Sequence, residues 1–193
     1  LLVSFLDNFF IHNSRLKVLQ LHHNNLHTIN KNLLYGLKDL HTLNLSHNQI
    51  FHVDRNSFDT LDGLQSLDLA DNRIEELSGI VFLSLKKLQT IDLSNNPIHQ
   101  LPLGIFANQL QLSALHMDNT NIIRLSNWID SITNSTINQQ ILSNLKHVSL
   151  RNSTNLRHIE SCFFFNLPQI ERLFITESRN LTFLPRGMEA MSQ

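Results

Sequence analysis

The sequence predicts an α/β solenoid, a curved horseshoe of stacked repeats with a parallel sheet on its concave side and irregular or short-helical segments on its convex side. The first observation is that the pattern Leu-x-x-Leu-x-Leu-x-x-Asn-x-Leu-x-x-Leu, with other apolar residues at some Leu positions and Thr or Ser at the last three Asn positions, recurs seven times along the 193 residues. The second observation is the period of the repeat. Successive copies lie 24 residues apart four times, and the last two spacings are 33 and 25 residues. Such a period is typical of repeat proteins, in which each unit packs on its neighbours. The copies open at Leu16, Leu40, Leu64, Leu88, Leu112, Leu145 and Ile170.

The first part of each copy predicts a short β-strand. In the copy that opens at Leu64, the apolar residues Leu67 and Leu69 alternate with the polar residues Ser66 and Asp68. This alternation is typical of a half-buried strand, with leucines in the core and polar residues in solvent. About 18 residues then lead to the next strand, which is long enough for the crossover that parallel strands need.

The ninth position of each copy predicts a ladder of buried side chains. It reads Asn24, Asn48, Asn72 and Asn96, then Thr120, Ser153 and Ser178. An asparagine amide has donors and an acceptor and can bond the backbone of neighbouring turns, whereas Thr and Ser offer only a hydroxyl. We therefore expect a structural ladder that weakens after Asn96.

The convex side is predicted to rest on a row of large apolar residues six positions before the copies, which only Gln139, before the copy at Leu145, interrupts. This row, a core spine, contains Phe10, Leu34, Phe58, Phe82, Phe106 and Phe164. The 33-residue copy carries an insertion at residues 126–144. Its apolar residues Trp128, Ile129, Ile132, Ile141 and Leu142 have near-helical spacing, which favours a longer buried crossover over a protruding contact loop.

Residues 1–193 are expected to form a single repeat array that begins and ends inside a repeat. Leu2 and Phe5 fit the end of an earlier copy, and Met188 and Met191 fit the positions before another. Solenoids carry polar caps over their end repeats, and neither end of this sequence has the features of a cap.

These repeats resemble the extracellular-type leucine-rich repeats of animal receptors and adhesion proteins. The resemblance rests on the 24-residue period and on the phrase Phe58-x-x-Leu61-x-x-Leu64 that leads into a strand. The last two copies, with Leu156 and Leu181 one residue late, loosely resemble the irregular repeats of glycoprotein-hormone-type receptor ectodomains. The similarity to Toll-like receptor ectodomains is equally loose. The resemblance implies a scaffold that recognises a protein ligand on its concave face.

Composition and motifs exclude several other functions. A net charge of −1 at pH 7 lacks the basic footprint of a nucleic-acid binder, and no apolar run is long enough for this segment to insert into a membrane. The five glycines form no phosphate-binding loop, and no catalytic motif is present, so we expect no enzyme and no cofactor. His23 and His47 occupy equivalent positions without a completing ligand set, so we expect no metal site.

The outward positions of the strands predict the ligand-binding residues. They are Gln20, His22, His47, Asp68, Asp71, Asp92, His116, Asp118 and Arg151. The acidic centre of this set predicts a partner with a basic patch facing Asp68, Asp71 and Asp92. A merely solvated polar sheet remains the alternative, because solubility also requires polar outward residues.

Four Asn-x-Ser/Thr sequons, at Asn134, Asn180, Asn152 and Asn44, predict glycosylation on an extracellular or cell-surface protein. A glycan on Asn44 would block the concave face. The function expected is therefore that of a receptor or adhesion ectodomain binding a protein ligand or another cell-surface protein, and a homodimer stays open. A secreted or matrix scaffold and a cytosolic interaction adaptor are the alternatives.

Overall fold

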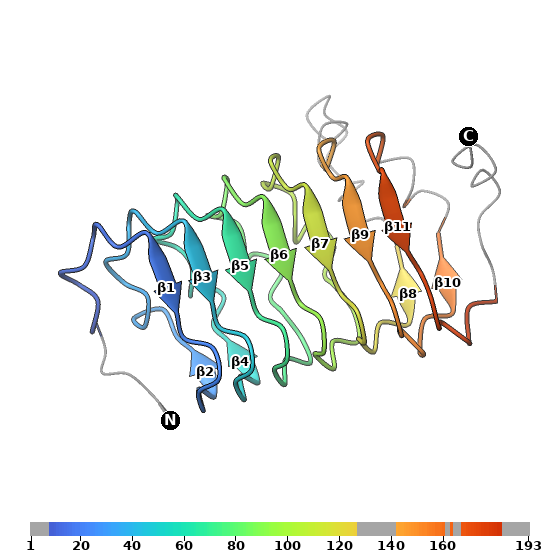
Figure 1. Ribbon diagram of the computed structural model, residues 1–193, viewed down its shortest axis with the longest axis horizontal. Helices are drawn as coiled ribbons and strands as arrows, with labels where there is room; N and C mark the ends of the chain where they lie inside the picture. The colour runs from blue at the N-terminus through green and yellow to red at the C-terminus, as the bar shows by residue number, and fades with distance from the viewer. Residues whose placement is uncertain (1–7, 127–141, 161–162, 164–166, 183–193) are drawn as a thin grey trace.

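The computed structural model describes residues 8–126, 142–160, 163 and 167–182 of the chain. Within this part, a parallel sheet of seven strands runs the length of the molecule, one strand per repeat (Figure 1). This confirms the predicted solenoid, and the convex side of the described residues consists of turns with almost no helix. The strands, in sheet order, are β1 (Val18–Gln20), β3 (Thr42–Asn44), β5 (Ser66–Asp68), β6 (Thr90–Asp92), β7 (Ala114–His116), β9 (His147–Ser149) and β11 (Arg172–Phe174).

The register of this sheet follows the sequence repeat. Leu43 pairs with Leu19 on one side and with Leu67 on the other, so equivalent positions of each repeat stand side by side. The central residue of each of these strands points inward, and Leu43 is fully buried. Burying one such side chain contributes about 1.5–3 kcal/mol, and the repeat multiplies that contribution along the stack.

Shorter strands lie along one flank of the solenoid, where the chain leaves the sheet. β2 (Thr28–Ile29) pairs with β4 (His52–Val53), and β8 (Arg124–Leu125) pairs with β10 (His158–Ile159). These two pairs occupy opposite ends of the flank, and no strand stands between them in the described chain (Figure 1).

The predicted aromatic spine lies under the convex side. The rings of Phe58 and Phe82 stack at 6.1 Å between centroids, and those of Phe82 and Phe106 at 5.9 Å. Leu34 continues the row and is fully buried, as are the three aromatic residues. Phe164 lies outside the described residues, as does the part of the insertion that carries Trp128, Ile129, Ile132 and Ile141.

Asparagine side chains link neighbouring repeats beside the sheet. Asn72 accepts a hydrogen bond from Ile50 N at 2.9 Å and donates to Leu45 O of the previous repeat at 3.0 Å. Its amide also donates to Leu69 O in its own turn. Asn48 and Asn96 make the same set of bonds one repeat earlier and one repeat later. Each amide thus satisfies buried backbone groups of two repeats at once.

The hydroxyls that replace these amides in the later repeats make fewer hydrogen bonds. Thr120 Oγ1 donates only to Met117 O, within its own turn. The hydroxyls of Ser153 and Ser178 are buried and have no hydrogen-bond partner among the described residues. The repeats that follow Asn96 are therefore joined by fewer polar bonds at this position.

Replacing Asn72 by alanine should lower the free energy of unfolding by about 2–4 kcal/mol, because buried carbonyl and amide groups of two repeats lose their partner. Thr120→Ala, which removes one bond within a single turn, should cost about 1 kcal/mol or less. Urea unfolding of both variants provides the measurement. Equal losses for the two would contradict the inter-repeat role of the asparagine.

Candidate ligand-binding face

On the solvent side of the seven-stranded sheet, called the sheet face below, one residue of each strand forms a central row, in which Ser149 is buried. The strand register places these residues side by side, about 4.8 Å apart, so the row is roughly 30 Å long. In order they are Gln20, Asn44, Asp68, Asp92, His116, Ser149 and Phe174. Gln20 is exposed, while Asp68, Asp92 and His116 are half-buried.

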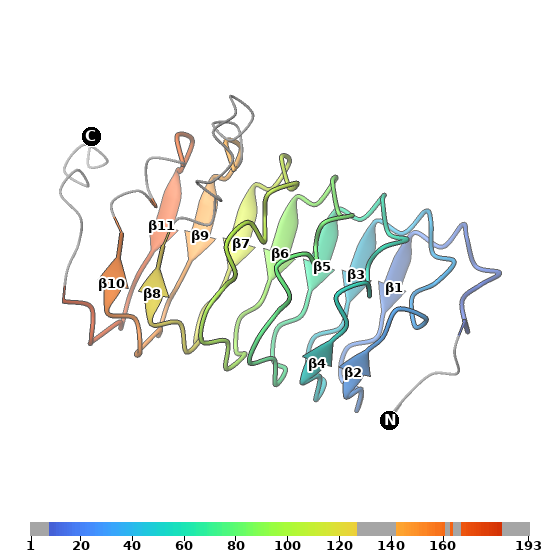
Figure 2. The same ribbon diagram turned by 180° about the vertical axis from the view of Figure 1, so that it is seen from behind.

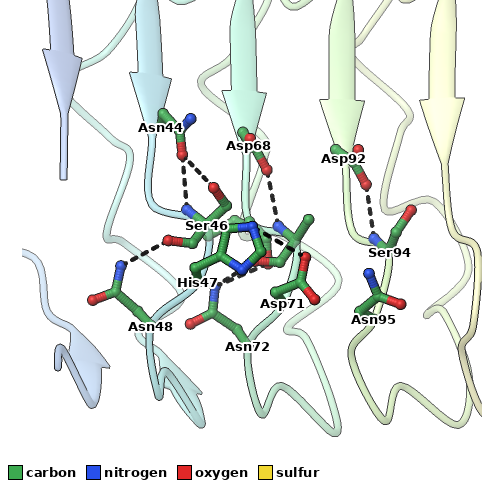
Figure 3. Close-up of polar contacts among 12 residues, drawn as sticks. Asn44, Ser46, His47, Asn48, Asp68, Asp71, Asn72, Asp92, Ser94 and Asn95 are labelled. Atoms are coloured by element: carbon green, nitrogen blue, oxygen red, sulfur yellow. Dashed lines mark hydrogen bonds and ion pairs between the residues drawn. The ribbon is translucent and has the colours of Figure 1, made fainter. Parts of the chain in front are cut away.

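Three residues of this row cap the turn that follows their own strand (Figure 3). Asp68 Oδ1 accepts a hydrogen bond from Ala70 N at 3.0 Å, and Asp92 Oδ1 accepts one from Ser94 N at 2.8 Å. Asn44 Oδ1 accepts the equivalent bond from Ser46 N at 2.9 Å. These are the local bonds that Asx side chains make in turns, and they fix the orientation of each side chain. The second carboxylate oxygen of Asp68 and of Asp92 has no partner within the described residues.

A second row, called the turn row below, lies just beyond the ends of the strands. Its members have a left-handed backbone with φ between 52° and 59°. Asn, Asp and His tolerate this conformation better than most residues, and six of the seven members are of these types. Asp71, which the sequence predicted among the ligand-binding residues, belongs to this row and not to a strand. The turn row contains His23, His47, Asp71, Asn95, Asn119, Asn152 and Glu177.

Histidines occupy the N-terminal end of the turn row. The rings of His23 and His47 stack with centroids 4.2 Å apart and planes 6° apart, and His22 meets His23 edge-on. His47 Nε2 lies 3.6 Å from Asp71 Oδ2, so this carboxylate faces a histidine and not only solvent. Stacked rings do not converge on one point, and among the described residues no group of three or more His, Cys, Asp or Glu side chains could hold a metal ion.

Amides continue the turn row toward the C-terminus. Asn119 Nδ2 donates to Asn95 Oδ1 at 3.0 Å, and Asn152 Nδ2 donates to Asn119 Oδ1 at 3.1 Å. Sequence reasoning did not anticipate these side-chain ladders. The available signal was the run of His, Asp and Asn at one repeat position, which are the residue types that adopt positive φ most readily.

Asp118 holds two successive repeats together. Its Oδ1 atom accepts hydrogen bonds from Ser149 Oγ and, at 2.7 Å, from Arg151 N. Ser149 stands where Asp68 and Asp92 stand in earlier repeats, so here the turn is capped by the preceding repeat instead of its own. Asp118 is therefore less available to a ligand than its sequence position suggested.

The C-terminal end of the sheet face has mixed charge. The guanidinium of Arg151 lies 4.3 Å from the centre of the Phe174 ring, a cation–π contact. Lys146 Nζ lies 2.8 Å from Glu171 Oε1. The hydrogen bond and the charge of Lys146 lower the pKa of Glu171 from its ordinary value. This end therefore presents Arg151 and Arg172 with a neutralised Lys–Glu pair beside them.

The sequons fall in different surroundings. Asn44 is half-buried in the central row, whereas Asn152 and Asn180 are exposed. Asn180 Nδ2 donates to Thr154 O of the previous repeat at 2.7 Å. Asn134 lies outside the described residues.

Comparison with known families identifies a repeat family. The family described as Leucine rich repeat matches four overlapping stretches, residues 1–50, 14–74, 40–98 and 62–122. No curated protein matches the sequence. No helix of the described residues is long and apolar enough to cross a membrane.

Solved structures share the fold. One is a complex of TLR13 with ssRNA13, at 26% identity and a TM-score of 0.70 over 94% of this chain and 29% of that one. Another is the leucine-rich repeat domain of APL1, at 25% identity and a TM-score of 0.65 over 77% of this chain and 36% of that one. The chain thus spans about a third of the length of each of these relatives.

Replacing Asp92 by asparagine should leave the free energy of unfolding within about 0.5 kcal/mol of the parent, because an amide oxygen can accept the same bond from Ser94 N, as Asn44 does from Ser46 N. Asp92→Ala should cost about 1 kcal/mol, because the turn loses its cap. Thermal unfolding compares the two. A larger loss for the asparagine variant would show that the charge, and not the hydrogen bond, stabilises the turn.

Proposed function

Because the chain belongs to the leucine-rich repeat family, we propose that it is part of the ectodomain of a cell-surface receptor or adhesion protein and binds a protein ligand on its sheet face. Leucine-rich repeat folds are typically binding scaffolds and not enzymes, since an open sheet does not exclude water as catalysis requires. The likeness to TLR13 and APL1 supports a recognition role.

The observation that carries this proposal is the arrangement of charge on the sheet face. Asp68 and Asp92 stand on adjacent strands, each with one oxygen tied to its own turn and the other directed away from that bond. Their orientation is set before a ligand arrives, so little side-chain entropy is lost on binding. Cationic groups of a protein ligand are the complement of this centre, and such pairs mainly set the rate of association and the choice of partner.

A nucleic-acid ligand is the less suitable partner. TLR13 was solved in complex with an RNA, ssRNA13, which raises that alternative for this chain. Proteins that bind RNA or DNA place Lys and Arg against the phosphates, whereas the centre of this sheet face is acidic. A protein with a basic patch fits the observed charges better.

The location of the protein can be tested through its glycans. Full-length protein expressed in a secreting animal cell should carry an N-linked glycan at Asn134 or Asn180 with Asn44 bare, and intact-mass analysis of glycopeptides detects both. A glycan on Asn44 would move the ligand off the sheet face. If the protein is not secreted and carries no glycan, the result would favour a cytosolic adaptor. A secreted product without a membrane segment would favour a matrix scaffold.

The acidic centre can be tested with a cationic probe. At low salt, the double variant Asp68→Asn/Asp92→Asn should bind a fluorescent octalysine peptide about fivefold more weakly than the parent, because two carboxylates are neutralised while the turn caps remain. Asp39→Asn/Asp62→Asn, which removes two exposed carboxylates elsewhere, provides the matched control. If both double variants weaken binding equally, the probe responds to net charge and the sheet face has no special role.

A further inference from the structure

A second surface, distinct from the sheet face, lies on the flank where the chain leaves the sheet. In the first two repeats this flank is closed by backbone hydrogen bonds, since His27 O accepts from Phe51 N at 3.0 Å and Ile29 O accepts from Asp54 N at 2.9 Å. The far end is closed in the same way, with Ile123 O accepting from Arg157 N at 2.9 Å. Neighbouring repeats at both ends are thus joined as strands.

Between these ends several of the equivalent backbone hydrogen bonds are missing from the described chain. The carbonyls of Phe51 and Val53 correspond to those of His27 and Ile29, and they accept no backbone hydrogen bond from the described chain. Opposite them, the amides of Glu75 and Ser78 donate none. On this flank the described chain keeps one backbone–backbone hydrogen bond between the two repeats, from Arg73 N to Ile50 O at 2.8 Å, next to the bond from Ile50 N to the Asn72 side chain. We call residues 51–56, which include β4, and residues 75–78 the open flank; in Figure 2 it comprises β4 and the segment next to it on the side away from β2.

One repeat further along, the same interruption has a cause in the sequence. Pro102 occupies the position of Ser78 and of Asp54, and proline has no N–H to donate. His99 N still reaches Glu75 O, at 3.3 Å. The flank therefore lacks strand pairing across the middle repeats, while the sheet on the other side of the same repeats is continuous.

Two open hollows lie along this interruption and share Glu76. The larger, of about 690 Å³, is lined by both segments of the open flank and by Lys31. The smaller, of about 350 Å³, lies between Phe51 and His99. Phe51 is 56% exposed and lines the smaller hollow, whereas Phe58, Phe82 and Phe106 are fully buried.

Charges of opposite sign stand along the two hollows. Lys31 and Arg55 are exposed in the larger hollow, where Asp54 is already bonded to His52 Nε2 at 2.9 Å and Glu76 is the other carboxylate. Glu75 and Glu76 are exposed in the smaller one, next to Arg73. Among the described residues no salt bridge joins Lys31, Arg55, Arg73, Glu75 or Glu76 to another side chain. The hollows therefore offer a cationic end and an acidic end with unused charge.

We propose that the open flank binds an extended peptide segment of a partner protein. The peptide main chain donates to Phe51 O or Val53 O and accepts from Glu75 N or Ser78 N, which is recognition by strand addition. An acidic side chain of the peptide meets Lys31 and Arg55, a basic one meets Glu75 and Glu76, and an apolar one covers Phe51, which lines the same hollow as these two glutamates. This site is independent of the ligand proposed for the sheet face.

The probe is the fluorescein-labelled peptide Asp-Val-Thr-Val-Lys with blocked ends, measured by fluorescence anisotropy on the full-length protein. The same peptide N-methylated at both valines keeps its side chains but loses two backbone donors, and it should bind at least about tenfold more weakly. Ser-Val-Thr-Val-Ser, without charges, should also bind more weakly. Equal binding of all three peptides would overturn the proposal.

Two variants locate the site. Ser78→Pro removes one of the unpaired amides, and the turn tolerates proline because Pro102 stands at the same position of the next repeat. It should weaken binding of the parent peptide about fivefold. Glu76→Lys should also weaken it, whereas Asp62→Lys, an equal charge change on an exposed residue away from the hollows, should not. If the two lysine variants weaken peptide binding to a similar extent, net charge explains the effect, and the proposed location of the site is contradicted.

Amide hydrogen exchange provides a readout that does not depend on affinity. In the free protein Glu75 and Ser78 should exchange fast, and Phe51 and Asp54 slowly, because only the latter two donate to another repeat. The peptide should slow exchange at Glu75 and Ser78. A different result would be slow exchange at these amides in the free protein that becomes fast on dilution, together with a dimer in sedimentation that the Ser78→Pro variant does not form. That result would assign the open flank to a second copy of the chain and overturn the proposal.

Discussion

The stack depends on how each repeat satisfies the buried backbone groups of the turn beside the sheet. A solenoid unit contacts only its two neighbours, so every unpaired group inside it has to be satisfied by its own repeat or the adjacent one. Asn48, Asn72 and Asn96 do this with one amide each, by accepting from one repeat and donating to two. The hydroxyls of Thr120, Ser153 and Ser178 cannot replace those bonds. The polar link that this position makes between repeats therefore grows weaker toward the C-terminus, although the apolar core continues.

The same residues serve the fold and the candidate binding face. Asp68 and Asp92 each use one oxygen to cap a turn, which leaves a single oxygen, held in a fixed direction, for a ligand. Asp118 gives its capping oxygen to the next repeat, where Ser149 has no carboxylate of its own. His47 and Asp71 face each other in the turn row. Fewer aspartates are thus available to a ligand than the sequence suggests, and the acidic centre consists of Asp68 and Asp92.

The two faces of the middle repeats differ in a way that matters for recognition. On the sheet side, the backbone pairs from strand to strand without a break. On the flank, the carbonyls of Phe51 and Val53 and the amides of Glu75 and Ser78 find no partner in the described chain, and hollows lie beside them. A repeat that departs from its neighbours exposes groups that the regular repeats cover. The irregular positions, more than the regular ones, therefore offer backbone groups that a specific partner could bind.

The sequence by itself determined the solenoid, the position of each long strand and the inward leucines, because a 24-residue period brings equivalent residues such as Leu43 and Leu67 into register. It also placed Asp68 and Asp92 next to each other on an outward row. Only the tertiary structure decided which atoms of those residues are used by turns, how the rings of His23 and His47 stack, and where the flank stays unpaired. The physical reason is that a repeat pattern fixes positions to within a residue, whereas hydrogen bonds depend on distances of a few tenths of an ångström and on side chains from two repeats.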